Sequence, residues 1–135
     1  MSMLQPKKFK HKKVRKGKLK RLTYNSKLDF GLIGLRSLES GFITSKQLES
    51  ARQAISRKIK KKGGKIWIKI FPNTPITKKP KEVRMGKGKG SVSHWASRIR
   101  GGTIIFEIGG VNDKTAATAF RTGGAKLPIK TQMFS

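Results

Sequence analysis

The residues best suited to chemistry form a short basic segment in which glycines alternate with lysines. They run consecutively along the chain as Arg84, Met85, Gly86, Lys87, Gly88, Lys89, Gly90 and Ser91. Glycine lets a backbone approach another backbone closely or take a positive φ, and the arginine and lysines add positive charge at the same place. This combination indicates a flexible loop that binds a phosphate backbone at close range. A solvated hairpin tip is the alternative interpretation.

The familiar phosphate-binding motifs do not fit this segment. A Walker A loop needs lysine followed by serine or threonine, whereas Lys87 and Lys89 are each followed by glycine. A kinase glycine loop would need a larger chain with a catalytic aspartate and metal-binding partners. A dinucleotide fingerprint opens a helix, but a strand is predicted after Ser91. We therefore expect no nucleotide cofactor and no small-molecule substrate.

Positive charge dominates the whole chain. Lysine and arginine number 33 against six acidic residues among 135, which gives a net charge of +27, and no acid precedes Asp29. Such a chain needs a polyanion to neutralise it, with nucleic acid as the first candidate and an anionic membrane as the second. The candidate RNA-binding residues near the N-terminus are Lys7, Lys8, Lys10, His11, Lys12, Lys13, Arg15, Lys16, Lys18, Lys20 and Arg21.

The chain divides into an arm and a body. Residues 1–27 contain few large apolar side chains among dense charge, so we expect an extended basic arm that becomes ordered only on its partner. Residues 28–135 carry regular apolar patterning and are predicted to form one globular domain, with the basic glycine-rich loop at residues 84–91.

Several classes of protein are excluded by composition. There is no cysteine, which removes disulfides, thiol catalysis and cysteine-ligated metals, and His11 and His94 cannot form a metal site by themselves. No apolar run approaches the roughly 18 residues of a membrane span, and the first residues lack the apolar stretch of a secretory signal. We expect neither a cofactor nor a membrane partner.

The most clearly predicted element is a helix that begins after Thr44. Thr44 and Gln47 form a capping box, and the apolar stripe of Leu48, Ala51, Ile55 and Ile59 recurs at helical spacing. Gly63 and Gly64 end it. Arg52, Arg57, Lys60, Lys61 and Lys62 lie on its other faces and last turn, where they either contact RNA or form a solvated surface.

The remaining elements are predicted from alternation and turn residues. Strands are expected at residues 30–36, 65–71 and 127–134, with prolines interrupting any ladder from 72 to about 82. Residues 92–100 and 103–108 are expected to pair as a hairpin across Gly101 and Gly102. Asn112 or Asp113 can cap a second, shorter helix, whose apolar face is Ala116, Ala117, Ala119 and Phe120 and which ends at Gly123 and Gly124. This order predicts an α+β fold, an antiparallel or mixed sheet with two helices packed on it.

Six blocks of this chain resemble one known family. Residues 3–7, 44–54, 64–72, 75–80, 83–90 and 125–131 are similar, in the same order, to large-subunit ribosomal protein sixteen of the bacterial and organellar type. The resemblance implies an α+β sandwich that catalyses no reaction. It also implies that the protein binds large-subunit rRNA beside the aminoacyl-tRNA site, among neighbouring ribosomal proteins, and supports tRNA positioning and late subunit assembly.

The resemblance also assigns roles and a location. In that family the basic arm and the loop matching residues 84–90 enter rRNA near the peptidyl-transferase region, and the arginine matching Arg84 is hydroxylated in some bacterial members. The implied location is the ribosome, in the bacterial cytoplasm or in a mitochondrion or plastid.

The residues alone leave other interpretations open. Trp67 and Trp95 could stack on unpaired bases or pack within the protein, and Phe9 and Tyr24 could anchor the arm or stack on a base. A small ribonuclease using His94, His11 and a lysine, or a DNA-compacting protein, are the competing functions outside the ribosome.

Overall fold

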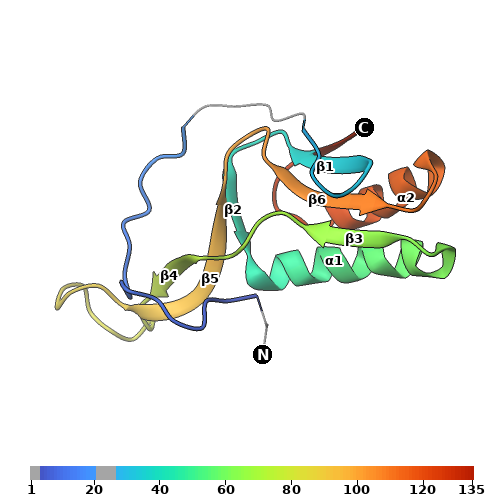
Figure 1. Ribbon diagram of the computed structural model, residues 1–135. Coiled ribbons are helices and arrows are strands. Elements are labelled where there is room, and N and C mark those ends of the chain that lie inside the picture. The colour runs from blue at the N-terminus through green and yellow to red at the C-terminus, as the bar shows by residue number, and fades with distance from the viewer. Residues whose placement is uncertain (1–3, 21–26) are drawn as a thin grey trace.

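Two antiparallel sheets and two α-helices make up the body of the protein (Figure 1). The structure is a computed structural model that describes residues 4–20 and 27–135. The elements in chain order are β1 (Ile33–Ser37), β2 (Gly41–Thr44), α1 (Ser45–Ile59), the 3-10 helix η1 (Lys60–Lys62), β3 (Lys65–Ile68), β4 (Thr74–Lys78), β5 (Ser91–Ile99), β6 (Ile104–Gly109), α2 (Asp113–Gly124) and β7 (Thr131–Phe134). The predicted α+β class is confirmed. Within the described ranges, no helix is both long and apolar enough to cross a membrane.

The capping box predicted for α1 is present. The Gln47 backbone N–H donates to the Thr44 hydroxyl at 3.2 Å, and the Thr44 N–H donates to the Gln47 side-chain oxygen at 3.0 Å. The predicted stripe is buried in the core, and after η1 the chain leaves the helix through Gly63 at φ 73°. Local signals therefore determine both ends of this helix.

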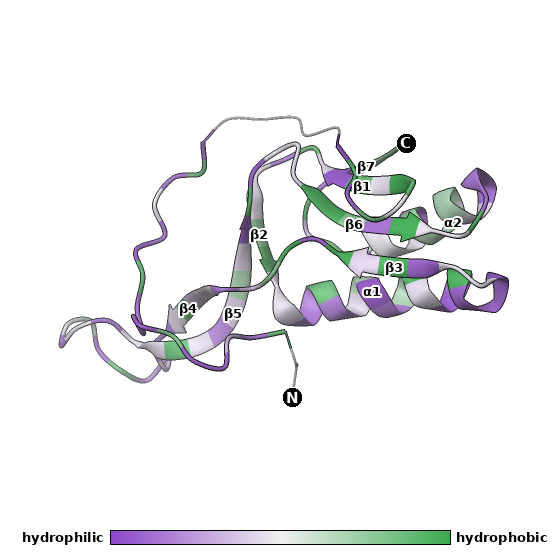
Figure 2. Cartoon of the chain, in the orientation of Figure 1, coloured by the Kyte–Doolittle hydropathy of each residue, from purple (hydrophilic) through white to green (hydrophobic). Residues whose placement is uncertain are grey.

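Helix α2 starts at the first of its two predicted caps. The Asn112 side chain accepts the Thr115 N–H at 3.1 Å. Ala116, Ala119 and Phe120 are buried as predicted. Ala117 is exposed, so the assignment of Ala117 to the buried face was wrong. α1 and α2 pack on each other and against the four-stranded sheet β3-β6-β1-β7 (Figure 1). Figure 2, which colours the chain by hydropathy, shows that β6 is mainly hydrophobic and that the arm is mostly hydrophilic.

The predicted hairpin between β5 and β6 is wrong. The turn exists, because Thr103 N–H donates to the Arg100 carbonyl at 3.2 Å, but β5 lies in the sheet β2-β5-β4 and β6 in the other sheet. The turn is tied to β1 instead: Gly102 N–H donates to the Ser37 carbonyl at 2.7 Å, and Ser37 N–H donates to the Thr103 carbonyl at 2.9 Å. β6 is buried on both faces and so takes an interior position between β3 and β1.

Strand boundaries account for the other differences. β2 and β4 were missed. β2 is only four residues long and its last residue, Thr44, is also the helix cap, and Pro75 argued against a strand at β4. β4 is an edge strand that pairs only with β5, and an edge position tolerates proline. β1 begins at Ile33 rather than at residue 30, and β3 ends at Ile68 rather than at residue 71. β7 is an edge strand, and Pro128 precedes it.

Candidate nucleic-acid interface

The glycine-rich loop projects from the end of the three-stranded sheet, between β4 and β5 (Figure 1). Residues 84–89 are exposed, and three consecutive residues, Gly86, Lys87 and Gly88, have φ values of 107°, 57° and 87°. Glycine adopts these left-handed φ values readily, but Lys87 is strained by them. Among the described residues, Lys87 is the only non-glycine residue with a positive φ. Met85 is fully exposed at the tip, at 102%. The loop is therefore held in an open conformation with its cations in solvent.

Two lysines that lie 76 residues apart in the chain hydrogen-bond the arm to this loop. Lys13 Nζ donates to the Lys89 carbonyl at 2.8 Å, and Lys89 Nζ donates to the Val14 carbonyl at 2.7 Å. Lys79 Nζ also donates to the Gly86 carbonyl at 2.5 Å. Each ammonium keeps further N–H groups that can reach an anion. The structure thus joins two predicted binding segments into one surface, which we call the arm–loop surface (residues 7–20 and 84–90).

Aromatic and cationic contacts hold the arm along the three-stranded sheet. The Phe9 ring meets the Trp95 ring edge-on with centroids 4.8 Å apart, and Lys16 Nζ lies 5.7 Å from the centroid of the Phe42 ring. Of the alternatives left open by the sequence, Phe9 and Trp95 therefore take the packing role. Lys7, Lys8, Lys10, His11, Lys12 and Arg15 are exposed, whereas Arg21 and Tyr24 lie outside the described residues.

Two arginines of the body extend this surface. Arg98 and Arg100 are exposed at the end of β5, and Arg98 Nη2 donates weakly, at 3.5 Å, to the Lys18 carbonyl. Together with Lys18, Leu19 and Lys20 they line a hollow of about 210 Å³. They were absent from the predicted site, although their spacing by two residues on a strand places both side chains on one face.

The basic residues of α1 and of the following η1 form a separate group. Arg52 is paired with Glu49, with Nη2 to Oε1 at 2.5 Å and Nε to Oε2 at 3.0 Å. This hydrogen bonding raises the pKa of Arg52 and lowers the pKa of Glu49. Lys62 donates to the Thr115 hydroxyl at 2.9 Å, while Arg57, Lys60 and Lys61 are exposed. Because α1 and η1 run away from the side of the molecule where the loop projects (Figure 1), these residues do not join the arm–loop surface.

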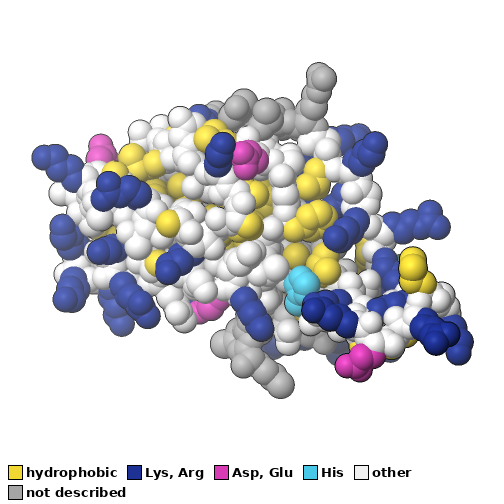
Figure 3. Space-filling view, turned by 180° about the vertical axis from the view of Figure 1, so that it is seen from behind, with side chains coloured by type: hydrophobic (Ala, Val, Ile, Leu, Met, Phe, Trp, Pro, Cys, Tyr) yellow, Lys and Arg dark blue, Asp and Glu magenta, His cyan; other side chains and the backbone are white. Residues whose placement is uncertain are grey.

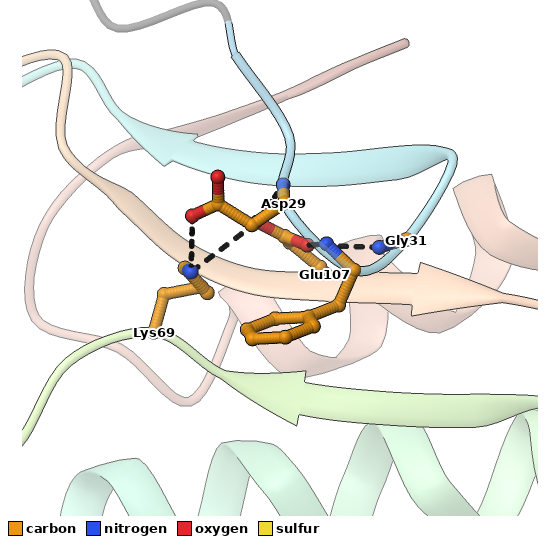
Figure 4. Close-up of polar contacts among 5 residues, drawn as sticks. Asp29, Gly31, Lys69 and Glu107 are labelled. Atoms are coloured by element: carbon orange, nitrogen blue, oxygen red, sulfur yellow. Dashed lines mark hydrogen bonds and ion pairs between the residues drawn. The ribbon is translucent and has the colours of Figure 1, made fainter.

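A buried carboxylate anchors the point where the arm enters the body. Glu107 on β6 is 0% exposed and accepts the backbone N–H groups of Asp29, Phe30 and Gly31 at 3.2, 2.7 and 2.8 Å (Figure 4). Burial raises the pKa of Glu107, but the three backbone donors and Lys69 outweigh burial and hold that pKa below its ordinary value. Residues 29–31 therefore have a fixed position over the sheet.

The few acids leave the basic surfaces uncompensated. Asp29 pairs with Lys69 at 2.6 Å, which lowers the pKa of Asp29, and Glu39 pairs with Lys130 at 3.6 Å. Within the described ranges, no cluster of three histidine, cysteine, aspartate or glutamate side chains could hold a metal ion. Figure 3 shows lysine and arginine side chains around the periphery of one face, with few acids among them.

The fold and these surfaces define a class: a small, basic α+β protein suited to binding nucleic acid. The family model described as Ribosomal protein L16p/L10e matches residues 5–134. The large ribosomal subunit protein uL16 of Wigglesworthia glossinidia brevipalpis is 53% identical over 129 residues, 96% of this chain and 94% of that protein. Those of Sulfurihydrogenibium sp. and Halorhodospira halophila are 52% and 51% identical, over 98% and 96% of this chain and 96% and 94% of their own lengths.

The chain therefore belongs to the ribosomal protein L16p/L10e family. It is a structural, non-enzymatic constituent of the large ribosomal subunit, and its bacterial relatives place it in the ribosome, in the cytoplasm. The resemblance found in the sequence is confirmed. A ribonuclease built on His94 and His11, or a DNA-compacting protein outside the ribosome, does not agree with membership of this family.

Proposed function

We propose that the arm–loop surface binds large-subunit rRNA and that residues 84–90 lie beside the aminoacyl-site tRNA, supporting tRNA positioning and late subunit assembly. The observation that carries this proposal is the pair of hydrogen bonds from Lys13 Nζ to the Lys89 carbonyl and from Lys89 Nζ to the Val14 carbonyl. They hold the arm beside the loop, so that one ligand can contact both. The proposal includes a division of the chain into an RNA-binding arm of residues 1–27 and a globular body of residues 28–135.

The charge of the arm–loop surface supports a phosphate polymer as the ligand. Residues 7–20 and 84–90 together contribute twelve lysines and arginines and no acid. Each lysine or arginine placed on a phosphate releases condensed counterions, so ten contacts would reduce affinity by about four to five decades over a fourfold rise in salt. Folded rRNA supplies phosphates at the density that such a surface requires. The exposed residues Arg57, Lys60 and Lys61 form a second proposed rRNA contact, to which Lys62 and the partly neutralised Arg52 also belong.

The experiment compares two double charge reversals in cells that depend on the variant chain. Lys87→Glu with Lys89→Glu changes the loop, and Lys46→Glu with Lys126→Glu makes the same charge change at exposed positions of the body. Lys79 is unsuitable as a control because it donates to the loop at Gly86. We expect the loop variant to accumulate immature large subunits in sucrose gradients and to slow tRNA accommodation on purified subunits. Equal defects in the two double variants would contradict the special role of the loop.

A further inference from the structure

An aromatic pair lies exposed on the four-stranded sheet, outside the arm–loop surface. The ring of Phe30 stacks on that of Trp67 with centroids 6.1 Å apart and planes 22° from parallel. Phe30 is 64% exposed and Trp67 is half-buried. A large aromatic ring left in solvent on so basic a protein suggests a surface that a ligand covers.

The backbone that carries the exposed ring is fixed. The Phe30 N–H donates to Glu107 at 2.7 Å, and its neighbours Asp29 and Gly31 donate to the same buried carboxylate (Figure 4). Gly31 lies so close to β6 that a Cβ atom there would sit 2.6 Å from the Ile108 carbonyl oxygen. Because the backbone on both sides of Phe30 is fixed, little conformational entropy would be lost when a flat ligand stacks on its ring.

One cation lies over the Phe30 ring, and it also lines a basic hollow next to residue 29. Lys69 Nζ lies 4.6 Å from the centroid of the Phe30 ring and pairs with Asp29. A hollow of about 340 Å³ beside it is lined by Lys27, Asp29, Lys69, Arg100, Gly102, Thr103 and Ile104. Three cations line the hollow with Asp29, and Glu107 lies beneath it with Oε1 3.9 Å from Lys69 Nζ. The cations still outnumber the two carboxylates, so the hollow favours an anion. Arg100 also lines the hollow of the arm, which makes the two basic surfaces continuous.

We propose that the Phe30–Trp67 pair is a stacking platform for one unpaired RNA base, whose phosphate enters the hollow lined by Lys27, Lys69 and Arg100. The proposal rests on the RNA-binding function proposed above and adds a second kind of contact to it, with the base instead of the backbone. Unpaired bases stack on aromatic side chains of β-sheets, and a flanking cation holds the phosphate. An apolar segment of a neighbouring protein would leave the three cations without an anionic partner.

Binding of two short oligomers separates the platform from the charge of the arm. Single-stranded oligoadenylate carries bases, and an abasic phosphodiester oligomer of the same length carries only the backbone. Phe30→Ala should weaken oligoadenylate binding by about 5- to 100-fold, the range that removal of one base–aromatic stack produces. It should leave the abasic oligomer unaffected. Phe30→Trp should retain oligoadenylate binding, and Leu32→Ala, at a neighbouring residue that is 78% exposed, should change neither affinity.

The possible failures are distinguishable. If Phe30→Ala binds both oligomers as the unaltered chain does, the platform is refuted while the arm–loop surface stands. If the unaltered chain binds neither oligomer, the proposed RNA-binding function itself fails. Ultraviolet cross-linking of intact large subunits supplies the native ligand: a nucleotide adduct on the peptide containing Phe30 or Trp67 supports the platform. A cross-link from this peptide to another protein, or nucleotide adducts confined to the arm, overturns it.

Discussion

Replacing Glu107 with glutamine tests whether one buried carboxylate fixes the junction of arm and body. In the native chain Oε2 accepts the N–H groups of Phe30 and Gly31, and Oε1 accepts that of Asp29. The amide oxygen of Glu107→Gln can keep the first two bonds. Its NH2 group then faces the Asp29 N–H, so that two donors meet and the third bond is lost.

The cost follows from these three bonds. One unsatisfied donor costs about 1–3 kcal/mol, and loss of the negative charge weakens each of the two remaining bonds by roughly 1 kcal/mol. The free energy of unfolding should therefore fall by about 3–5 kcal/mol at neutral pH, a large part of the roughly 5–15 kcal/mol of a typical domain. For a chain of this length the unfolding midpoint should fall by roughly 10–20 °C.

The effect should depend on pH with a definite sign. The pKa of Glu107 is lower in the folded chain than its ordinary value, so the carboxylate stabilises the fold above that ordinary value. This contribution is lost as the pH falls through the lowered pKa. The difference in unfolding free energy between the unaltered chain and Glu107→Gln should therefore be largest at neutral pH and should shrink in acid.

Urea denaturation at neutral and acidic pH measures both quantities. Glu82→Gln removes the same charge at an exposed position and serves as the control. Hydrogen exchange of the Phe30 and Gly31 amides should accelerate in Glu107→Gln and not in Glu82→Gln. If the two variants differ by less than about 1 kcal/mol at neutral pH, or if their difference does not change with pH, the three bonds do not carry the stability assigned to them.

Two further changes test how the helices are held. Thr44→Ala removes the cap of α1 and should lower the free energy of unfolding by about 1 kcal/mol. Ser50→Ala, at an exposed position of the same helix, should change that free energy little. Equal effects of the two variants in urea denaturation would contradict a stabilising role for the cap. Gly123→Ala places a Cβ atom in steric overlap with Ile55 Cγ1, between the packed helices α1 and α2. Thermal unfolding should show a loss of about 1–3 kcal/mol. Ala117→Ser on the exposed side of α2 is its control, and a Gly123→Ala variant as stable as this control would mean that the helices separate at no cost.

The accuracy of each sequence-based prediction depended on how local its physical cause was. The start of α1 was predicted to the residue, and the start of α2 was narrowed to one of two adjacent caps, because a cap and its partner lie within one turn of each other. The turn at Gly101 and Gly102 was also predicted correctly. The pairing of its flanking strands was not, because Ser37, more than sixty residues away, takes the hydrogen bonds that a hairpin would have used.

The candidate site divides in the same way. The cations of the arm and of residues 84–90 stand out in the sequence because they form runs and alternate with glycine. Nothing in the sequence indicates that Lys13 and Lys89 meet, or that Arg98 and Arg100 extend the same surface. Glu107 is one acid among six in the sequence, and only the approach of residues 29–31 gives it a role.

The sequence by itself determined the excess of positive charge, the ends of the helices, the α+β class and the resemblance to a ribosomal family. These properties depend on composition or on residues within a few positions of one another. The tertiary structure decided which strands share a sheet, which cations face the same ligand, and how the ring of Phe30 is presented to solvent. Those outcomes depend on distant segments that compete for the same backbone hydrogen bonds and the same buried volume. No local sequence pattern indicates which segment forms those contacts.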